Sequence, residues 1–209
     1  MNTAPIRLVT PKGLAEYPHI EEPDTKFDDN GVYHVNLILN KEESASIIDK
    51  MNEILQDFIA NDIKLKEAKA RGKQYVLQDF YEELNEDEIR LKFKQKASYI
   101  RKSDGKEVQV KIPVFDSKGT PVKDVNIGSN STLRVCFTAN PYYMPATKSV
   151  GLSLRLVAVK LIELVERGNG GASGYGFGEE EEGYVQNNTN TTTKVVETFD
   201  DLEEDSADF

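Results

Sequence analysis

Hydrophobic and polar residues alternate along residues 31–39 and along much of residues 91–166. A period of two is typical of β-strands with one buried face. The final segment becomes apolar on both faces, as the closing of a small barrel requires. The tetrapeptide SDGK at 103–106 predicts a tight hairpin turn, and DSKGTP and IGSNS predict further turns. The pattern predicts strands at 31–39 (GVYHVNLIL), 91–99 (LKFKQKASY), 107–115 (EVQVKIPVF), 132–138 (TLRVCFT) and 149–166 (SVGLSLRLVAVKLIELVE).

A helical period follows the first of these strands. Asn40 can cap a helix, and Glu43 stands three residues later, where it completes a capping box. Gly72 is expected to end the helical segment that continues beyond these residues. The apolar residues that recur at helical spacing are Ile47, Ile48, Met51, Ile54, Leu55, Phe58 and Ile59.

These elements predict a mainly β fold. About five short antiparallel strands, with one substantial helix between strands, are typical of a five-stranded Greek-key barrel of the OB type. A β-sandwich is the nearest alternative. We expect one ordered domain over residues 1–167. Residues 168–209 are a Gly-, Asn- and Thr-rich linker with an acidic end, and we expect them to be disordered.

The charges are unevenly distributed along the chain, whose formal net charge is -10. Residues 1–89 carry a net charge of -9, from ten bases and nineteen acids. Residues 90–167 carry +9, from fifteen bases and six acids, and residues 178–209 carry -10, from one base and eleven acids. A basic half-domain inside an acidic chain favours an interaction with nucleic acid or with the chain's own tail.

Catalytic and metal-binding motifs are missing from the sequence. No nucleophile elbow or phosphate-binding loop occurs, and His19 and His34 have no partner at metal-ligand spacing, so we expect no enzyme, metal or cofactor. The single cysteine, Cys136, is interpreted as structural and suits a reducing cytoplasm. No signal peptide opens the chain and no apolar run approaches about 18 residues. We therefore expect an intracellular protein without a membrane segment.

The basic segment 90–167 contains cationic and aromatic residues of the kind that bind single-stranded nucleic acid. Cations follow the phosphates, and aromatic faces stack on the bases. Pro141 and Pro145 bracket two tyrosines in the segment NPYYMPATK (140–148), which we expect to be a loop that holds an aromatic outward. Phe93 and Phe115 are expected behind this surface. The candidate residues are Lys92, Lys94, Lys96, Tyr99, Arg101, Lys102, Lys111, Arg134, Tyr142, Tyr143 and Lys148.

Several of these segments together resemble the bacteriophage replication-type single-stranded DNA-binding proteins, an OB-fold family with an acidic tail ending in Phe. They are FKQKASY, VFDSKGTPVKDV, NPYYMPATKSVGLSLRLVAVKLIEL, the Gly-rich linker and the final EEDSADF, and GLAEYPHIEEPD near the start is similar too. The resemblance covers about residues 13–167 and the tail. By motif position it implies that Tyr142 stacks on a base, that Lys94 and Lys96 lie in the groove, and that Phe209 docks a partner.

The same resemblance implies the role and the partners. Proteins of this family coat single-stranded DNA in replication, repair and recombination, and they recruit the phage DNA polymerase and helicase–primase in the infected bacterial cytoplasm. A tail that reaches a neighbouring copy is compatible with a homodimer. The tail is also expected to compete with DNA for the groove. The expected tail contacts are Asp200, Asp201, Glu203, Glu204, Asp205, Asp208 and Phe209.

Two other functions remain open from the sequence. The chain could be a protein-interaction adaptor whose acidic tail is the functional element and whose barrel is a scaffold. An RNA-binding barrel of the cold-shock type is disfavoured, because no RNP-type run of aromatic residues occurs.

Overall fold

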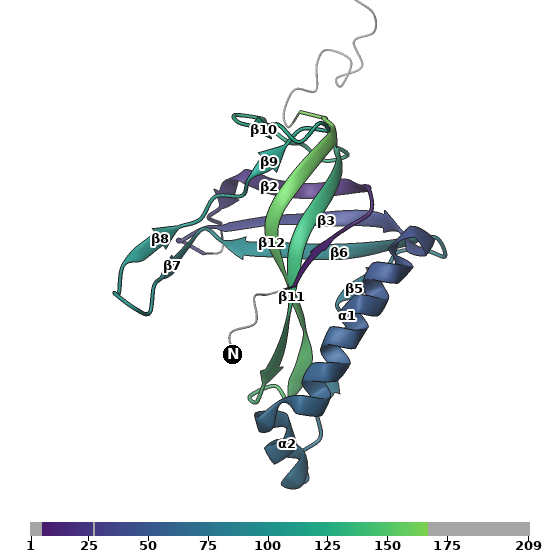
Figure 1. Ribbon diagram of the computed structural model, residues 1–209, viewed down its shortest axis with the longest axis vertical. Helices are drawn as coiled ribbons and strands as arrows, with labels where there is room; N and C mark the ends of the chain where they lie inside the picture. Colours follow the sequence, from purple (N-terminus) through teal and green to yellow (C-terminus); the bar gives the residue numbers. More distant parts are fainter. Residues whose placement is uncertain (1–5, 27, 167–209) are drawn as a thin grey trace, which may run out of the picture.

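The computed structural model describes residues 6–26 and 28–166, which form a barrel with a helical arm at its side (Figure 1). Its strands, in order around the ring, are β2 (Gly13–Asp24), β3 (Val32–Asn40), β6 (Glu88–Lys96), β12 (Ser149–Glu163) and β11 (Thr132–Met144). Each strand pairs with the next, and β11 pairs with β2, so the five strands form a closed ring. The β6–β12 junction is parallel and the others are antiparallel. The expected OB-type barrel is thereby confirmed.

The core follows the alternation of the sequence. Val35 and Leu37 of β3 and Leu91 and Phe93 of β6 are fully buried, and the Phe93 ring packs against that of Phe137 with centroids 4.9 Å apart. Burying each such side chain contributes about 1.5–3 kcal/mol. The other face of β6 is therefore free to carry charge, and Phe93 lies behind that face, as expected.

The helical segment is two helices, α1 (Lys41–Asn61) and α2 (Ile63–Ala70), where the sequence predicts one. Asn40 caps α1 as expected, since its side chain accepts a hydrogen bond from the backbone N–H of Glu43 at 3.0 Å. Asp62 has an extended backbone and its side chain accepts from the N–H of Leu65 at 2.9 Å, so it ends α1 and caps α2. The break arises from this second cap, which the hydrophobic period does not reveal. Gly72 follows α2 with a φ of 71°.

Short strands add to the barrel sheet, except those at 98–100 and 107–109, which pair with each other in a separate two-stranded sheet. The predicted single strand 107–115 is wrong: it is two strands separated by residues 110–113, because Pro113 cannot donate to a ladder. The acidic segment 81–88, where the alternation predicts no strand, also contains one. The short strands are β1 (Arg7–Val9), β4 (Val76–Leu77), β5 (Tyr81–Glu83), β7 (Ser98–Ile100), β8 (Glu107–Gln109), β9 (Val114–Phe115) and β10 (Pro121–Val122).

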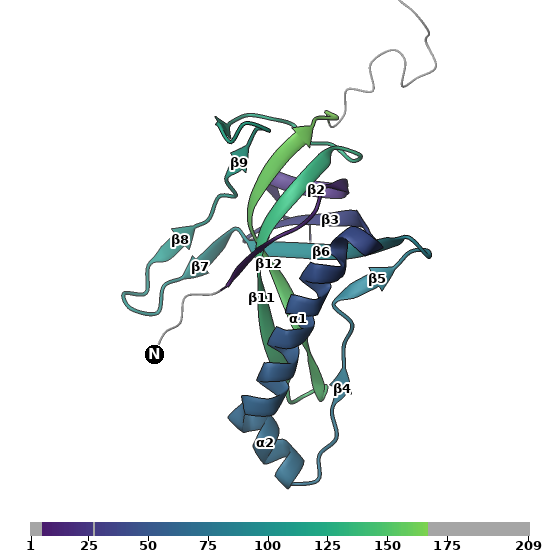
Figure 2. The ribbon, with the colours of Figure 1, turned by 45° about the vertical axis from the view of Figure 1, so that its right-hand side comes forward.

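The hairpin of β11 and β12 runs beyond the barrel, alongside α1 and β4 (Figure 2). Its pairing continues to Met144 and Ser149, so only residues 145–148 form the turn. The predicted loop at 140–148 is therefore wrong over its first half. The segment 140–144 stays in the ladder because its partners 149–153 are a regular continuation of β12.

The tail residues and the predicted boundary between 167 and 168 lie outside the described residues. Within the part of the chain that the structure describes, no helix is both long enough and apolar enough to cross a membrane.

Candidate nucleic-acid interface

Strand β6 presents a row of lysines. Lys92, Lys94 and Lys96 are exposed on its outer face, while the intervening residues are buried. At Ala97 the strand breaks, and β7 begins at Ser98. The break changes the alternation, so that Tyr99 becomes 46% exposed rather than facing the core.

The register of the barrel extends this row across the sheet. Lys94 lies opposite His34 of β3 on one side and opposite Arg155 of β12 on the other. The guanidinium of Arg155 also donates a hydrogen bond from Nε to the side-chain oxygen of Gln95. The pairing therefore sets Lys94 and Arg155 next to each other at the junction that closes the barrel.

A groove of about 620 Å³ opens at this junction, and we call it the Lys94 groove. Three of its lining residues, Lys94, Lys96 and Tyr99, are predicted from the sequence, whereas Arg155 is missed. The apolar neighbours Leu154 and Leu156 could have indicated that Arg155 points outward by alternation. The groove is lined by Val32, Lys94, Gln95, Lys96, Tyr99, Asn140, Ser153 and Arg155.

A second hollow of about 230 Å³ adjoins the groove and shares Lys94 and Ser153 with it. Phe80 and Tyr81 line this hollow, with ring centroids 5.4 Å apart in an edge-to-face arrangement. Both rings also pack against the hydrophobic core, so only part of each is exposed to this hollow. Neither residue is among the candidates taken from the sequence, because Tyr81 lies in an acidic segment and Phe80 directly before it.

The ladder between β11 and β12 relates Tyr142 to the groove. Asn140 lies opposite Ser153, and Tyr142 lies opposite Gly151, two residues further along the same face. Tyr142 therefore continues the face that Asn140 and Ser153 contribute to the groove. The neighbouring Tyr143 alternates to the other face and packs against the core.

Ion pairs occupy part of the lysine row. Glu82 binds Lys92 (Nζ to Oε2, 3.1 Å) and Arg90 (Nη1 to Oε1, 3.2 Å), and the hydrogen bonds from Lys92 and then Arg90 hold the pKa of the Glu82 carboxyl below its usual value. Lys96 lies 3.8 Å from Asp28. Among the described residues no acid pairs with Lys94. Lys94 is therefore the member of the row most available to a phosphate.

Other predicted cations lie away from the groove. Arg134 lines a separate hollow with Arg7, Lys12 and Lys50, and its Nε donates to the carbonyl of Thr10 at 3.0 Å. The register places it opposite Lys160, toward the other end of β12 from Ser153. Arg134 therefore does not share the groove.

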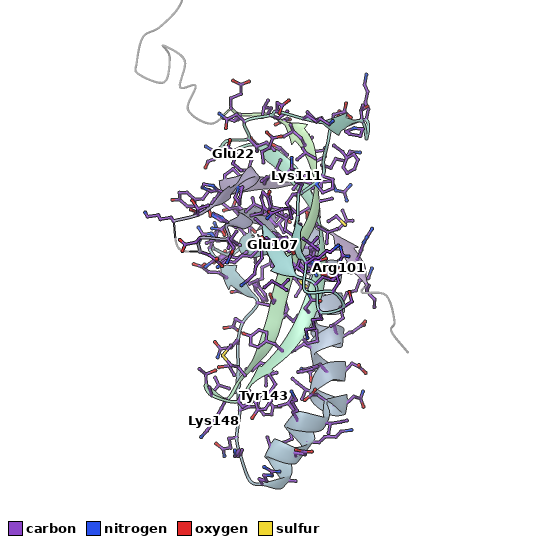
Figure 3. The ribbon with its side chains drawn as sticks, turned by 90° about the vertical axis from the view of Figure 1, so that its left-hand side faces the viewer. Glu22, Arg101, Glu107, Lys111, Tyr143 and Lys148 are labelled. Atoms are coloured by element: carbon purple, nitrogen blue, oxygen red, sulfur yellow. The ribbon has the colours of Figure 1, made fainter. Side chains whose placement is uncertain are left out.

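The remaining predicted cations are spread along the molecule (Figure 3). Arg101 lies near the middle of the long axis and pairs with Asp104 at 3.2 Å, and Lys102 follows it in the β7–β8 turn. Lys111 lies toward one end, and Lys148, in the β11–β12 turn, toward the other. None of the four lines the groove or the adjoining hollow. The predicted tail contacts from Asp200 to Phe209 lie outside the described residues.

The two histidines were not expected to have partners, but the structure brings them together. His19 and His34 lie opposite each other on β2 and β3, and Asp24 completes a group whose ligand atoms are within 4.8 Å of one another. Sequence spacing could not show this group, because strand register creates it.

Comparison with known proteins identifies the family. The family model described as "Single-stranded DNA-binding protein, Bacteriophage T7" matches residues 12–164. The chain belongs to this family. The resemblance noted in the sequence is thereby confirmed. The family's curated members are named for binding rather than for catalysis, in agreement with the expectation of a protein that is not an enzyme.

Individual relatives cover nearly the whole chain. The single-stranded DNA-binding protein of Escherichia phage T7 is 29% identical over 93% of this chain and 92% of its own length. That of Enterobacteria phage T3 is 25% identical over 94% and 92%. The crystal structure of gp2.5, a single-stranded DNA-binding protein encoded by bacteriophage T7, superposes with a TM-score of 0.68 at 27% identity, covering 88% of this chain and all of that one.

Proposed function

We propose that this protein binds single-stranded DNA without sequence preference, with the Lys94 groove as the center of the interface. The observation that carries the proposal is the meeting of Lys94, Lys96, Arg155 and Tyr99 in one open groove. Membership of a family whose members are named for this binding supports it.

The groove's chemistry suits a flexible strand. Its cations can follow the phosphates, while Tyr99 and Tyr142 offer ring faces on which successive bases stack, each stack contributing about 1–3 kcal/mol. Stacking accepts every base, because each base has a π-face, and phosphate contacts carry no sequence information. Of the remaining predicted cations, Arg101 and Lys102 lie just beyond Tyr99 in sequence and extend the positive charge outward. Such a surface coats a strand and protects it, and it can present the strand for annealing to its complement.

The acidic tail is the natural competitor of DNA. Residues 178–209 carry -10 and residues 90–167 carry +9, so the tail can occupy the groove as a weak polyanion that salt screens strongly. DNA displaces the tail and makes its end available to other proteins. Phe209 then supplies an apolar anchor that charge alone does not provide.

The partners proposed for the tail are the DNA polymerase and the helicase–primase of the phage. The similarity of the chain, including the ending EEDSADF, to phage replication proteins supports this assignment. A tail that docks such partners only after DNA has displaced it would couple the coating of DNA to recruitment.

Fluorescence anisotropy with labelled oligo-dT tests the binding proposal. The full chain and a variant lacking residues 179–209 are titrated over a range of salt concentrations. We expect affinity to fall steeply as salt rises, because released counterions dominate it. We also expect the shortened protein to bind more tightly at low salt.

The outcomes separate the proposals. Equal affinity of the two proteins would refute competition by the tail while leaving DNA binding in place. If neither protein binds oligo-dT at low salt, the barrel is a scaffold and the adaptor function is favoured. Tighter binding to oligo-U of the same length than to oligo-dT would favour an RNA-binding role.

A further inference from the structure

The only two histidines of the chain lie side by side on the barrel. His19 of β2 is the register partner of His34 of β3, and their ring centroids are 4.8 Å apart at an interplanar angle of 36°. Directly opposed residues on neighbouring strands project from the same face of a sheet. The two imidazoles are therefore brought together by the strand pairing itself.

A carboxylate joins them through an irregularity in β2. Asp24 is five residues from His19, so on a regular strand it would project from the opposite face. The register shifts between these residues: five steps along β2, from His19 to Asp24, correspond to only two along β3, from His34 to Val32. The extra residues bring Asp24 back to the histidines, and its Oδ2 lies 3.4 Å from Nε2 of His34.

The carboxylate is oriented by the backbone. Its other oxygen, Oδ1, accepts a hydrogen bond from the N–H of Lys26 at 2.9 Å, which leaves Oδ2 directed at His34. That bond is the main cause of the lowered pKa of the Asp24 carboxyl, to which His34 also contributes. A carboxylate fixed by an outer hydrogen bond is typical of the way metal ligands are held.

The distances suit a tetrahedral ion. With bonds of about 2.0–2.1 Å, two ligand atoms of a tetrahedral zinc site lie about 3.3 Å apart. The separation between His34 and Asp24 matches this edge, and it exceeds the 2.7–2.9 Å or so of a strong charge-assisted hydrogen bond. All three ligand atoms lie within 4.8 Å of one another, so a bound ion would draw them closer to reach this edge length.

We propose that His19, Asp24 and His34 form a binding site for a divalent transition-metal ion of the zinc class. Two imidazoles and one carboxylate select zinc, cobalt or nickel over magnesium and calcium, which prefer oxygen ligands alone. Three protein ligands leave a fourth position open to water. The side chains of His34 and Asp24 are about a quarter exposed, at 24% and 25%, so an ion can enter from solvent.

The proposed metal site lies close to the Lys94 groove. His34 is also the register partner of Lys94, so a bound dication would lie one strand away from the lysine at the center of the groove and on the same face. The metal-binding proposal itself does not depend on DNA binding and is tested without DNA.

The test uses the full chain, purified without a histidine tag and stripped of metal with a chelator. Cobalt(II) is titrated while its visible absorption is recorded, and zinc binding is measured by calorimetry with excess magnesium present to occupy the acidic tail. We expect one equivalent of cobalt with the intense bands of a four-coordinate site, displaced by zinc.

Variants identify the ligands. Replacing His19→Gln, His34→Gln or Asp24→Asn should each weaken zinc binding by at least about tenfold. Cys136→Ser and Asp28→Asn are controls, because the first removes the chain's only thiol and the second a nearby acid outside the group. Neither control should change the affinity.

Circular dichroism confirms that each variant is folded, and the nearly isosteric Asp24→Asn keeps the test decisive if a histidine variant fails to fold. Failure of the wild-type chain to bind one equivalent of zinc would overturn the proposal. So would zinc binding that survives in the folded Asp24→Asn and histidine variants, or that is lost in Cys136→Ser.

Discussion

Lys94 lies directly opposite Arg155, in the register pair that joins β6 to β12. The parallel junction that completes the barrel thus brings two cations together. Like charges facing each other across a pair of strands destabilise a sheet. Such a cost to the fold is typical of functional surfaces, where stability is given up for binding. The arrangement becomes favourable once an anion lies between the two side chains.

Replacing Lys94→Met should separate stability from binding. Methionine keeps the apolar stem of lysine but removes the charge, so the repulsion with Arg155 disappears and the free energy of unfolding should not fall. The affinity for oligo-dT should decrease at low salt. The slope of log affinity against log salt should become shallower by about 0.7 for the lost phosphate contact. Anisotropy titrations and urea unfolding measure the two quantities.

Lys118→Met is the matched control, because Lys118 is exposed in the β9–β10 turn and lines neither the groove nor the adjoining hollow. It should leave the salt slope unchanged. If both variants lose affinity equally, net charge rather than the groove accounts for binding, and the proposed interface is wrong.

Tyr142 and Tyr143 should respond differently to truncation. Tyr142 continues the face of the groove, so Tyr142→Ala should weaken oligo-dT binding by about 1–3 kcal/mol while the circular dichroism remains native. Tyr143 packs against the core. Tyr143→Ala should therefore lower the free energy of unfolding, on the order of 2 kcal/mol, with a smaller effect on DNA affinity.

The conservative change Tyr142→Phe serves as the control for this pair, since it keeps the ring face and should keep most of the affinity. An unchanged affinity in a folded Tyr142→Ala protein would exclude Tyr142 as a stacking residue. A loss of affinity confined to Tyr143→Ala would reverse the assignment.

Features encoded by neighbouring residues could be predicted from the sequence. The alternation of β6 places Phe93 in the core and the lysines outside, because the side-chain period of a strand is fixed by its geometry. The Asn40 cap of α1 depends on residues three apart and was also predicted. Lys94 and Lys96 were identified in this way, whereas Tyr99, chosen for its aromatic ring, reaches the groove only because the strand breaks at Ala97.

Features created by strand register could not be predicted. Arg155 lies opposite Lys94, and His19 lies opposite His34, only because strands distant in the sequence pair at particular residues. The extension of β11 through Pro141 was also missed, since proline and two tyrosines suggest a loop when their partners on β12 are unknown. Local composition likewise grouped Arg134 with the groove lysines, although the barrel separates them.

Gly151 should control the position of Tyr142 without carrying any charge. A Cβ added at Gly151 would lie 2.8 Å from Oη of Tyr142, 3.1 Å from its Cζ and 3.2 Å from Cβ of Gln78. Gly151→Ala must therefore displace the tyrosine ring. We expect a loss of oligo-dT affinity smaller than that of Tyr142→Ala, with the salt slope unchanged because no phosphate contact is lost.

A double variant shows whether the two residues act together. Gly151→Ala should cost nothing further in the Tyr142→Ala background, since the ring it displaces is already absent. Additive losses of affinity would mean that Gly151 acts through the strand rather than through Tyr142.

Glu82 should link acid sensitivity to DNA affinity. Because hydrogen bonds from Lys92 and Arg90 depress the pKa of its carboxyl, the stability that Glu82 contributes is present above its ordinary value of 4.5 and is lost as pH falls through the lower folded value. Urea unfolding between pH 7 and pH 3 should therefore show a smaller loss of stability in Glu82→Gln than in the wild type. At pH 7 the variant should also bind oligo-dT more tightly, because Lys92 is released to contact phosphate.

Glu86→Gln is the control, since Glu86 is exposed and forms no ion pair with another described residue. A Glu82→Gln protein with wild-type DNA affinity would show that Lys92 does not contribute to the interface.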